Sequence, residues 1–406
     1  MHKVIVTGGG AAGMIAAYFS ALRGNETVLI EKNEKLGKKL YITGKGRCNL
    51  TNDVSPREFL NFVVSNPKFL YGAINAFPPA DVCEFFTERG LALKTERGNR
   101  VFPLSDKSSD VIRTLEKALR SVGVEVLLNT EIKAVLTENG RVTGVETTDG
   151  KTTCDSLIVC TGGLSYPLTG STGDGFKFAA ACGHSVIPLS PSLSGIELKD
   201  GDFYDLQGLS LKNVAIKALE NGKTLYDDFG EMIFTHYGIS GPIVLSCSCL
   251  INRKRLDGVT IQIDLKPALD EKTLDNRLIR EFDAAKGKEL KTVMRSLLPL
   301  KLVPFVLGRV KISPDKKCGE ITREERRRII NGLKVNVFHP SKLRPIDEAI
   351  VTAGGVNVKE INPKTMESKL VGGLFFAGEV IDVDCFTGGF NLQTAFSTGF
   401  VAGNNA

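Results

Sequence analysis

The stretch HKVIVTGGGAAGMIAAYFSALRGNETVLIEK, which runs from His2 to Lys32, determines the fold class of this chain. An apolar run, VIV, leads into a turn that fits G-x-G-x-x-G at Gly8, Gly10 and Gly13, and a second apolar run, VLI, follows a helical pattern. Strand, glycine turn, helix and strand succeed one another within the length of one βαβ unit. The stretch therefore predicts an α/β protein with a Rossmann-like, dinucleotide-binding domain.

Each residue type in this unit suits one part of a dinucleotide. Gly8 makes the tight bend, Gly10 lets the backbone approach a pyrophosphate, and Gly13 lets the helix pack closely on the strand. The free N–H groups at the helix N-terminus can bind the phosphates. Glu31 ends the second strand, where a carboxylate can accept both hydroxyls of an adenosine ribose. This favours FAD or NAD over NADP.

The composition limits the class of protein. With 406 residues, 42% of them hydrophobic and 24% charged, the chain is expected to be a soluble globular protein of two or three domains. The net charge of +6 is compatible with an anionic cofactor or substrate and does not require nucleic acid. No tract reaches the roughly 18 apolar residues of a membrane span, so a cytoplasmic location is expected. Nine scattered cysteines and four histidines indicate neither a disulfide framework nor a metal site.

A polar, glycine-rich loop follows the first unit. In TGKGRCNLTN, Gly44 and Gly46 alternate with Lys45, Arg47 and Asn49. Backbone N–H groups and cationic side chains in such a loop can surround a phosphate or the edge of a flavin. The alternative is an ordinary solvated loop.

The segments up to residue 190 complete the first part of this domain. The spacing of the apolar residues predicts helices and strands here, and the Asn-Gly pair predicts a hairpin turn. The expected elements are helices within 56–122, strands at 124–128, 130–135 and 142–145 around Asn139-Gly140, and a buried strand at 155–160 that runs into Thr161-Gly162-Gly163. A hydroxyl-rich loop, 164–175, then precedes a helix at 176–182. This loop could line a polar substrate pocket with Tyr166 and Asp174, or Asp174 could serve only as a helix N-cap.

The pattern changes after about residue 190. Alternating apolar and polar residues predict strands up to 265, and the segment 266–333 is helical and basic, including the run Glu324–Arg328. That run could contact nucleic acid, but a solvated helix face is the favoured interpretation. The expected domains are a discontinuous FAD-binding domain (1–190 and 341–406), an inserted β-rich domain (191–265) and an inserted helical domain with a return strand (266–340).

The C-terminal stretch favours a flavoprotein over a simple NAD dehydrogenase. Residues 374–379 form an apolar run that ends in Gly378 and Glu379, and a glycine-led helix starts near Gly389. Glu379 can bind ribityl hydroxyls, and the helix N-terminus can face the N1–C2=O edge of a flavin, where charge gathers on reduction. The alternative is an ordinary strand–helix pair.

Over nearly its whole length the chain resembles the BaiN/YhiN-like FAD-dependent oxidoreductases, also called the aminoacetone oxidase family of FAD-binding enzymes. The motifs that carry the resemblance are VTGGGAAGMIAA, TGKGRCNLTN, GGLSYPLTGSTGDG, IFTHYGISGP, VTAGGV and FFAGEVIDVDCFTGGFNLQTAFSTG. Lys45 stands where many members carry glycine. The resemblance implies a glutathione-reductase-type FAD domain interrupted by a β-barrel-like domain and a small helical domain.

The motifs and the resemblance together give one set of predicted FAD contacts. These are Gly8, Gly10, Ala11, Ala12, Gly13, Glu31, Lys32, Lys39, Gly44, Gly46, Arg47, Cys48, Asn49, Ile132, Thr161, Gly162, Gly163, Gly378, Glu379, Gly389, Asn391 and Leu392.

The expected activity is hydride transfer between flavin N5 and a small or medium organic substrate. The resemblance implies either reduction of a steroid-like enone or amine oxidation with oxygen. A hypothesis of another class is an FAD-containing RNA-binding or RNA-modifying protein, although nucleic acid is not the expected partner. No second complete G-x-G-x-x-G unit is present, so NADH or NADPH would dock transiently as reductant.

Two residues are candidates for the proton transfer that accompanies hydride transfer. His236 lies in a glycine-punctuated turn of the insertion, and histidine titrates near neutral pH. It could instead only hydrogen-bond its own turn. Tyr166 is the rival donor, because its loop should leave the FAD domain beside the flavin.

Overall fold

The computed structural model describes residues 2–406, which fall into two compact units. Unit 1 contains the residues up to Ser192 together with Pro345–Ala406, and unit 2 contains Leu193–Arg344. The β-rich and helical parts of the insertion thus belong to one unit. None of the helices within 2–406 is long and apolar enough to cross a membrane.

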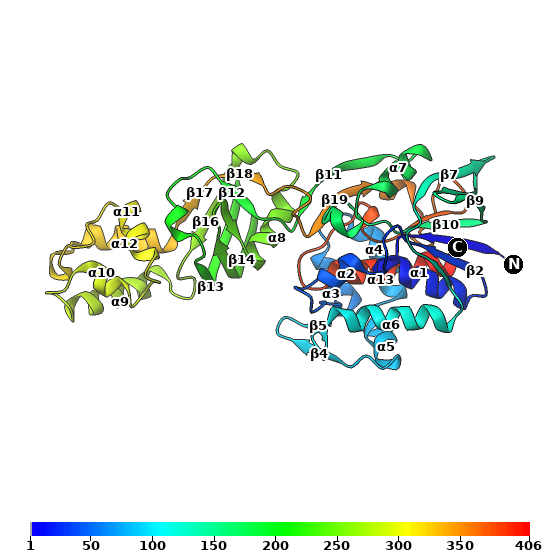
Figure 1. Cartoon of the computed structure of the whole chain (residues 1–406). Helices are drawn as coiled ribbons and strands as arrows, with labels where there is room; N and C mark the ends of the chain where they lie inside the picture. Colours follow the sequence, from blue (N-terminus) through cyan, green and yellow to red (C-terminus); the bar gives the residue numbers. More distant parts are fainter. Residues whose placement is uncertain (1) are drawn as a thin grey trace. The chain divides into compact units, whose positions relative to one another are not determined.

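Unit 1 is organised around a five-stranded parallel sheet (Figure 1). In spatial order its strands are β20 (Leu374–Phe376), β10 (Ser156–Val159), β1 (Lys3–Thr7), β2 (Glu26–Ile30) and β6 (Glu125–Leu127). Ile5 lies between Val28 and Leu157 in register, and all three are at most 3% exposed. Strands buried on both faces explain why these runs are continuously apolar.

Two helices from opposite ends of the chain pack closely against each other beside this sheet. They are α1 (Ala11–Leu22) and α13 (Phe390–Asn405). A Cβ added at Gly399 would lie 2.4 Å from the Ala12 carbonyl oxygen, and one at Gly403 would lie 2.3 Å from that of Ala16. The two glycines therefore permit a backbone approach that any side chain would prevent.

The remaining elements of unit 1 are short helices and small antiparallel sheets. The helices are α2 (Lys38–Ile42), α3 (Pro56–Phe59), α4 (Pro67–Ala76), α5 (Pro79–Glu88), α6 (Ser108–Ser121) and α7 (Asp174–Ala181). The strands are β3 (Thr51–Asn52), β4 (Leu93–Glu96) and β5 (Arg100–Pro103), then β7 (Ile132–Glu138), β8 (Arg141–Thr147) and β9 (Gly150–Thr153), and the pair β11 (Val186–Ser192) and β19 (Val351–Val356). Asn139 and Gly140 have φ of +49° and +74°, so the predicted hairpin turn is confirmed.

Unit 2 combines a seven-stranded sheet with a helical region. Its strands are β12 (Ile196–Leu198), β13 (Ser210–Glu220), β14 (Lys223–Phe234), β15 (Gly238–Ser240), β16 (Val259–Asp264), β17 (Asn336–Phe338) and β18 (Pro340–Leu343). The strand order is β17-β16-β13-β14-β15-β12-β18, and β18 also contacts β16. The barrel-like shape that the resemblance implied stays a prediction. The helices are α8 (Pro242–Ile251), which packs on β14, then α9 (Glu271–Asp283), α10 (Leu290–Met294), α11 (Leu302–Arg309) and α12 (Arg323–Lys334).

Seven short 3-10 helices complete the part of the chain that the structure describes, residues 2–406. They are η1 (Leu60–Phe62), η2 (Pro167–Thr169), η3 (Tyr204–Leu206), η4 (Leu256–Gly258), η5 (Cys318–Glu320), η6 (Val358–Glu360) and η7 (Gly378–Val380).

Candidate cofactor-binding site

In the glycine turn after β1, Gly8 and Gly13 pack closely on neighbouring backbone, whereas Gly10 faces open space. A Cβ at Gly8, where φ is +97°, would lie 2.5 Å from the Cys160 carbonyl oxygen, and one at Gly13 would lie 1.9 Å from that of Gly8. A Cβ at Gly10 would meet no atom within 4 Å. Gly10 is also the N-cap of α1, and no side chain caps this helix. The N–H groups that begin with Ala11 and Ala12 are therefore available to an anion.

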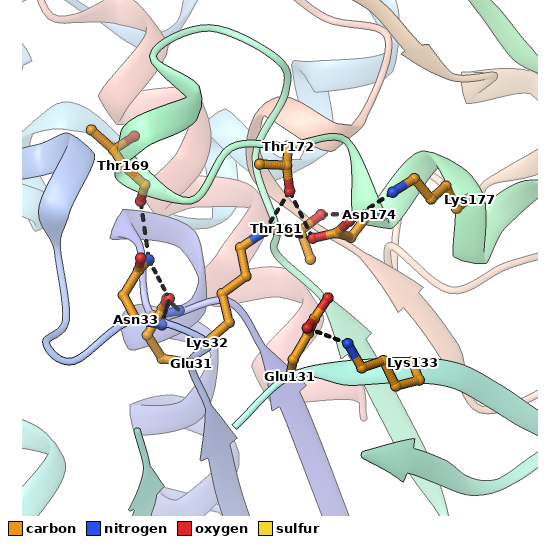
Figure 2. A network of polar contacts seen from close by, with 12 residues as sticks. Glu31, Lys32, Asn33, Glu131, Lys133, Thr161, Thr169, Thr172, Asp174 and Lys177 are labelled. Carbon is orange, nitrogen blue, oxygen red and sulfur yellow. Dashed lines mark hydrogen bonds and ion pairs between the residues drawn. The ribbon is translucent and has the colours of Figure 1, made fainter. Parts of the chain in front are cut away.

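Glu31, at the end of β2, is fixed by the turn and by its neighbour Asn33 (Figure 2). Its Oε2 accepts a hydrogen bond of 2.8 Å from the Gly9 N–H, and its Oε1 accepts from the Asn33 N–H (2.8 Å) and Nδ2 (2.6 Å). The side chain is only 8% exposed. Asn33 also donates to the Thr169 carbonyl oxygen at 3.1 Å, so it links the carboxylate to the loop before α7. Sequence reasoning missed Asn33.

Lys32 points into the same loop, toward Thr172 and Asp174 (Figure 2). Its Nζ contacts the Thr172 hydroxyl and lies 2.6 Å from Asp174 Oδ2, and Lys177 lies 3.1 Å from Asp174 Oδ1. Burial opposes ionisation of Asp174, but hydrogen bonds from Lys32, Thr172 and Lys177 hold its pKa below the ordinary value. The N-cap of α7 is Gly173, and Asp174 is the first residue of the helix. The interpretation of Asp174 as an N-cap was therefore wrong.

The loop after α2 is a run of left-handed residues. Gly44, Lys45, Gly46 and Cys48 have φ of +61°, +59°, +83° and +61°. Lys45 thus occupies a conformation that favours glycine. The Cys48 side chain is buried, and burial raises the pKa of its thiol. Asn49 Oδ1 is buried without a hydrogen-bond partner among residues 2–406.

Arg47 is directed at protein carboxylates. Its guanidinium lies 2.5 Å from Glu96 Oε1 and 2.6 Å from Asp106 Oδ1, and it stacks 4.2 Å from the Phe102 ring centroid. Lys94 also contacts Asp106, at 2.6 Å. These contacts occupy both sides of the guanidinium and brace the loop against β4 and β5.

A second carboxylate, the half-buried Glu379 in η7, organises the other half of the site. Its Oε1 accepts from the Thr352 N–H (2.9 Å) and the Ser165 hydroxyl (3.1 Å), and its Oε2 lies 2.6 Å from Lys39 Nζ. A Cβ at Gly163 would lie 2.4 Å from Thr352 Oγ1, so the turn after β10 packs directly on this cluster. Sequence reasoning missed Ser165 and Thr352. In the quoted motifs, Ser165 follows the glycine pair of GGLSYPLTGSTGDG, and Thr352 precedes the glycine pair of VTAGGV.

The residues just before and within α13 are held by backbone contacts. Gly389, with φ of +100°, is the N-cap, and a Cβ there would lie 2.4 Å from the Thr51 carbonyl oxygen. The Asn391 side chain donates to the Cys385 carbonyl oxygen and accepts from its N–H, both at 2.9 Å. Leu392 is partly buried and packs on the core of unit 1.

Four further predicted contacts also belong to unit 1. Thr161 Oγ1 accepts from the Gly175 N–H at 3.1 Å, and Gly162 has φ of +72°. Gly378, with φ of +77°, donates its N–H to Thr398 Oγ1 at 3.0 Å. Ile132 is buried at the start of β7.

The two candidate proton donors lie in different units. Tyr166, in unit 1, has φ of +54°, and its N–H donates to the Asp347 carbonyl oxygen at 3.1 Å. Burial raises the pKa of its phenol. His236, in unit 2, is exposed and packs edge-on against Tyr237 at 5.0 Å between ring centroids. Within residues 2–406 no cluster of three or more potential metal ligands occurs.

Comparison with known proteins identifies the family of this architecture. The family model described as the HI0933-like protein Rossmann domain matches residues 2–405. The chain belongs to the HI0933-like family of FAD-dependent oxidoreductases. The resemblance found in the motifs is thereby confirmed, and the protein is a flavoprotein oxidoreductase with a Rossmann FAD-binding domain.

Several HI0933-like relatives match almost end to end. The 3-dehydro-bile acid delta(4,6)-reductase of Clostridium scindens is 30% identical over 100% of this chain and 99% of its own. The ribosomal RNA dihydrouridine synthase of Haemophilus influenzae is 31% identical over 98% and 96%, and that of Escherichia coli is 30% identical over 97% and 95%. The 3-ketosteroid delta1-dehydrogenase structure from Sterolibacterium denitrificans shares the fold, with a TM-score of 0.54 at 14% identity over 100% of this chain and 99% of that one.

Membership of the HI0933-like family implies a flavin cofactor, and the residues present fit one. The N-terminus of α1 is uncapped, the Gly10 side of the turn is open, and Asn49 Oδ1 is a buried acceptor without a partner among residues 2–406. Buried polar atoms are normally hydrogen-bonded. A polar ligand bound at this loop could donate the hydrogen bond that Asn49 Oδ1 lacks.

Proposed function

We propose that this flavoprotein is an FAD-dependent reductase that saturates a carbon–carbon double bond conjugated to a carbonyl group. The supporting observation is the common chemistry of its end-to-end relatives. One is named as a reductase of a 3-dehydro-bile acid and two as dihydrouridine synthases. Dihydrouridine differs from uridine by saturation of the C5–C6 bond, which is conjugated to the C4 carbonyl. The named substrates differ, but the type of bond that is reduced is the same.

We propose that FAD is held in a domain of the glutathione-reductase type by contacts that run from α1 to α13. The N-terminus of α1 would bind the pyrophosphate, Glu31 the adenosine ribose, and Glu379 the ribityl chain. Lys39 would neutralise Glu379, since the two side chains already lie 2.6 Å apart. When bound, FAD supplies two-electron hydride chemistry between a nicotinamide and the organic acceptor.

The reaction requires one proton in addition to the hydride. The acceptor gains a hydride at the carbon β to its carbonyl and a proton at the α carbon, and the π bond between these carbons is lost. Tyr166 belongs to the same unit as the cradle residues, and its raised pKa keeps the phenol protonated at neutral pH. His236 is the alternative donor, since histidine as a residue type suits proton transfer near neutral pH.

A half-reaction experiment tests this proposal. Anaerobic protein reduced with one equivalent of NADPH or NADH is mixed with an α,β-unsaturated ketone, with uridine-containing RNA, or with a primary amine. Recovery of the oxidised flavin absorbance, together with a saturated ketone or dihydrouridine product, supports reduction of a conjugated bond. If oxidised protein is instead reduced by the amine, and oxygen then reoxidises it, the protein is an amine oxidase and the proposal is wrong.

A further inference from the structure

Asn33, two residues after Glu31, joins the Glu31 carboxylate to the loop that precedes α7 (Figure 2). Its N–H and its Nδ2 donate to Glu31 Oε1 at 2.8 and 2.6 Å, and Nδ2 also donates to the Thr169 carbonyl oxygen at 3.1 Å. Its Oδ1 accepts from Lys38 Nζ at 3.3 Å. Two acceptors face Nδ2 and a donor faces Oδ1, so these partners fix the orientation of the amide group.

This loop, residues 164–173, is tied in its middle by two neighbouring side chains. Within residues 2–406, the hydrogen bonds that reach residues 167–172 from outside the loop come from Lys32 and Asn33 alone. The same segment contains Leu168, which is 91% exposed. Burial of this large apolar side chain therefore does not anchor the segment, and the two polar side chains carry its attachment.

Gly170, in the middle of the 164–173 loop, packs directly on Asn33. Its φ is +102°, and a Cβ there would lie 2.4 Å from Asn33 Nδ2. A side chain at position 170 would therefore push the amide group away from Glu31, or push the segment away from Asn33. The loop and the carboxylate thus fix each other through one amide group.

Asn33 also determines which part of the Glu31 carboxylate remains free. A carboxylate has about four lone-pair positions, two on each oxygen. Asn33 occupies both positions of Oε1, and the Gly9 N–H occupies one position of Oε2 at 2.8 Å. No other hydrogen-bond donor within residues 2–406 reaches this carboxylate. The remaining position, on Oε2, is the one that a ligand hydroxyl can use.

We propose that Asn33 is a positioning residue that holds Glu31 ready for the adenosine ribose of FAD and couples FAD binding to the 164–173 loop. The inference rests on the proposed placement of FAD. A carboxylate that is already ordered loses little side-chain freedom when the ribose binds. Coupling between two sites is reciprocal, so a change in the loop must alter FAD affinity, and FAD must alter the mobility of the loop. The same loop carries Tyr166, so FAD orders the segment that holds a candidate proton donor.

The first experiment changes the loop and measures the cofactor. The dissociation constant of FAD from the full chain is measured by flavin fluorescence for Gly170→Ala. It should rise roughly two- to tenfold, the range expected when one side chain must be ordered on binding, because the new Cβ displaces the Asn33 amide group. Gly183→Ala is the matched control, since Gly183 has φ of +84° and a Cβ there would meet no atom within 4 Å. Its FAD affinity should stay within about twofold of the natural protein, as expected for an independent site.

Two double-mutant cycles show whether the effect passes through Asn33 and Glu31. Asn33→Ala should weaken FAD binding about as much as Gly170→Ala. The double variant Gly170→Ala/Asn33→Ala should bind FAD no more weakly than Asn33→Ala alone, because the group that the new Cβ would meet is gone. Asn33→Ala should also have no further effect on FAD affinity once Glu31 is replaced by alanine. Residues that act independently would give additive changes in both cycles.

Hydrogen exchange measures the coupling from the side of the loop. In the natural protein, FAD should slow the exchange of the Thr169, Gly170 and Thr172 amides, which donate to carbonyl oxygens within the loop. In Asn33→Ala saturated with FAD, this protection should be smaller. The Met14 amide, which donates to the Gly10 carbonyl oxygen at 3.0 Å at the start of α1, is the control and should be protected by FAD equally in both proteins.

The outcomes separate this inference from the proposed function. Non-additive cycles together with FAD-dependent protection of the loop support the role of Asn33. Equal FAD affinity of Gly170→Ala and Gly183→Ala, additive changes in either cycle, or loop exchange that FAD does not slow would overturn it. If Glu31→Ala itself left FAD affinity unchanged, the proposed placement of the ribose would be wrong, and the inference would fail with it. None of these measurements uses turnover, so they are independent of which double bond the protein reduces.

Discussion

The N–H of Gly9 donates a hydrogen bond of 2.8 Å to the Glu31 carboxylate, and this contact ties the glycine turn to the end of β2. A Cβ at Gly9 would lie 2.3 Å from a Leu36 methyl carbon and 3.3 Å from Glu31. The turn, the carboxylate and the segment before α2 thus fix one another. The residue expected to bind the adenosine ribose is positioned by the same turn that is expected to bind the pyrophosphate.

The first prediction concerns this carboxylate. Glu31→Ala should weaken FAD binding by about 1–3 kcal/mol, because it removes the expected ribose acceptor and leaves the Gly9 N–H unpaired. The measurement is the dissociation constant of FAD from deflavinated protein, followed by flavin fluorescence. Glu26→Ala is the control, because Glu26 begins the same strand and pairs with Lys3 at 3.2 Å. Equal FAD affinity in both variants would show that Glu31 does not bind the cofactor.

The second prediction concerns Gly389, the N-cap of α13. Gly389→Ala should destabilise the protein by more than the roughly 1 kcal/mol expected for a left-handed alanine, because its Cβ would lie 2.4 Å from the Thr51 carbonyl oxygen. Gly183→Ala isolates the conformational cost, since Gly183 has φ of +84° and its Cβ would meet no atom within 4 Å. Urea unfolding of both variants gives the two free energies. Equal losses would mean that α13 can move away from Thr51.

Local sequence signals predicted the framework of unit 1 well. The runs VIV and VLI became the central parallel strands, and Asn139-Gly140 became the hairpin between β7 and β8. Each of these features depends on the periodicity or backbone preference of neighbouring residues. The C-terminal return of the chain was predictable for the same reason, because residues 374–379 and 390–401 carry their own strand and helix patterns.

Contacts between residues distant in sequence were not predictable in this way. Ser165 meets Glu379 across 214 positions, and the Arg47 guanidinium meets Asp106 across 59. Motif reading assigned Arg47 to the cofactor because of its positive charge. In the structure, the Arg47 guanidinium forms ion pairs with the carboxylates of Glu96 and Asp106. The net charge of the whole chain, +6, does not reveal how the charge is distributed, since residues 266–340 alone carry +8.

The third prediction is a pH effect at His184 in unit 1. The side chain is fully buried, its Nε2 is 2.8 Å from Ser368 Oγ, and its Nδ1 is 3.3 Å from Glu360 Oε2. Burial lowers the pKa of His184 from 6.5, although Glu360 opposes this shift. Below about pH 6.5 the unfolded chain therefore binds a proton that the folded chain does not, so the free energy of unfolding should decrease as the pH falls.

Comparison with variants isolates this titration from that of other groups. Urea unfolding at several pH values between ~8 and ~5.5 should give a stability loss for the natural protein of up to about 1.4 kcal/mol per pH unit from this group. His184→Gln should be less stable at pH 8 but lose less on acidification. His2→Gln is the control, because the His2 side chain is 43% exposed. Parallel profiles for the natural protein and His184→Gln would show that the pKa of His184 is not depressed.

The last prediction distinguishes the two candidate proton donors. If His236 donates the proton, His236→Gln should keep its FAD and slow reduction of an unsaturated ketone by about 10²-fold or more. Flavin reduction by a nicotinamide should hardly change, because hydride transfer to the flavin does not need that proton. Tyr166→Phe should then behave like the natural protein in both half-reactions. The reverse pattern would assign the donor to Tyr166, whose raised pKa and place in unit 1 favour it.

Deuterium oxide provides a second measurement that a structural role would not affect. Removing the true donor should make the slowed half-reaction more sensitive to deuterium oxide, because proton transfer from solvent then limits the rate. A variant that slows both half-reactions equally and shows no added solvent isotope effect has lost structure at its turn. For His236 this would mean that the exposed imidazole serves only to hold the segment between β14 and β15.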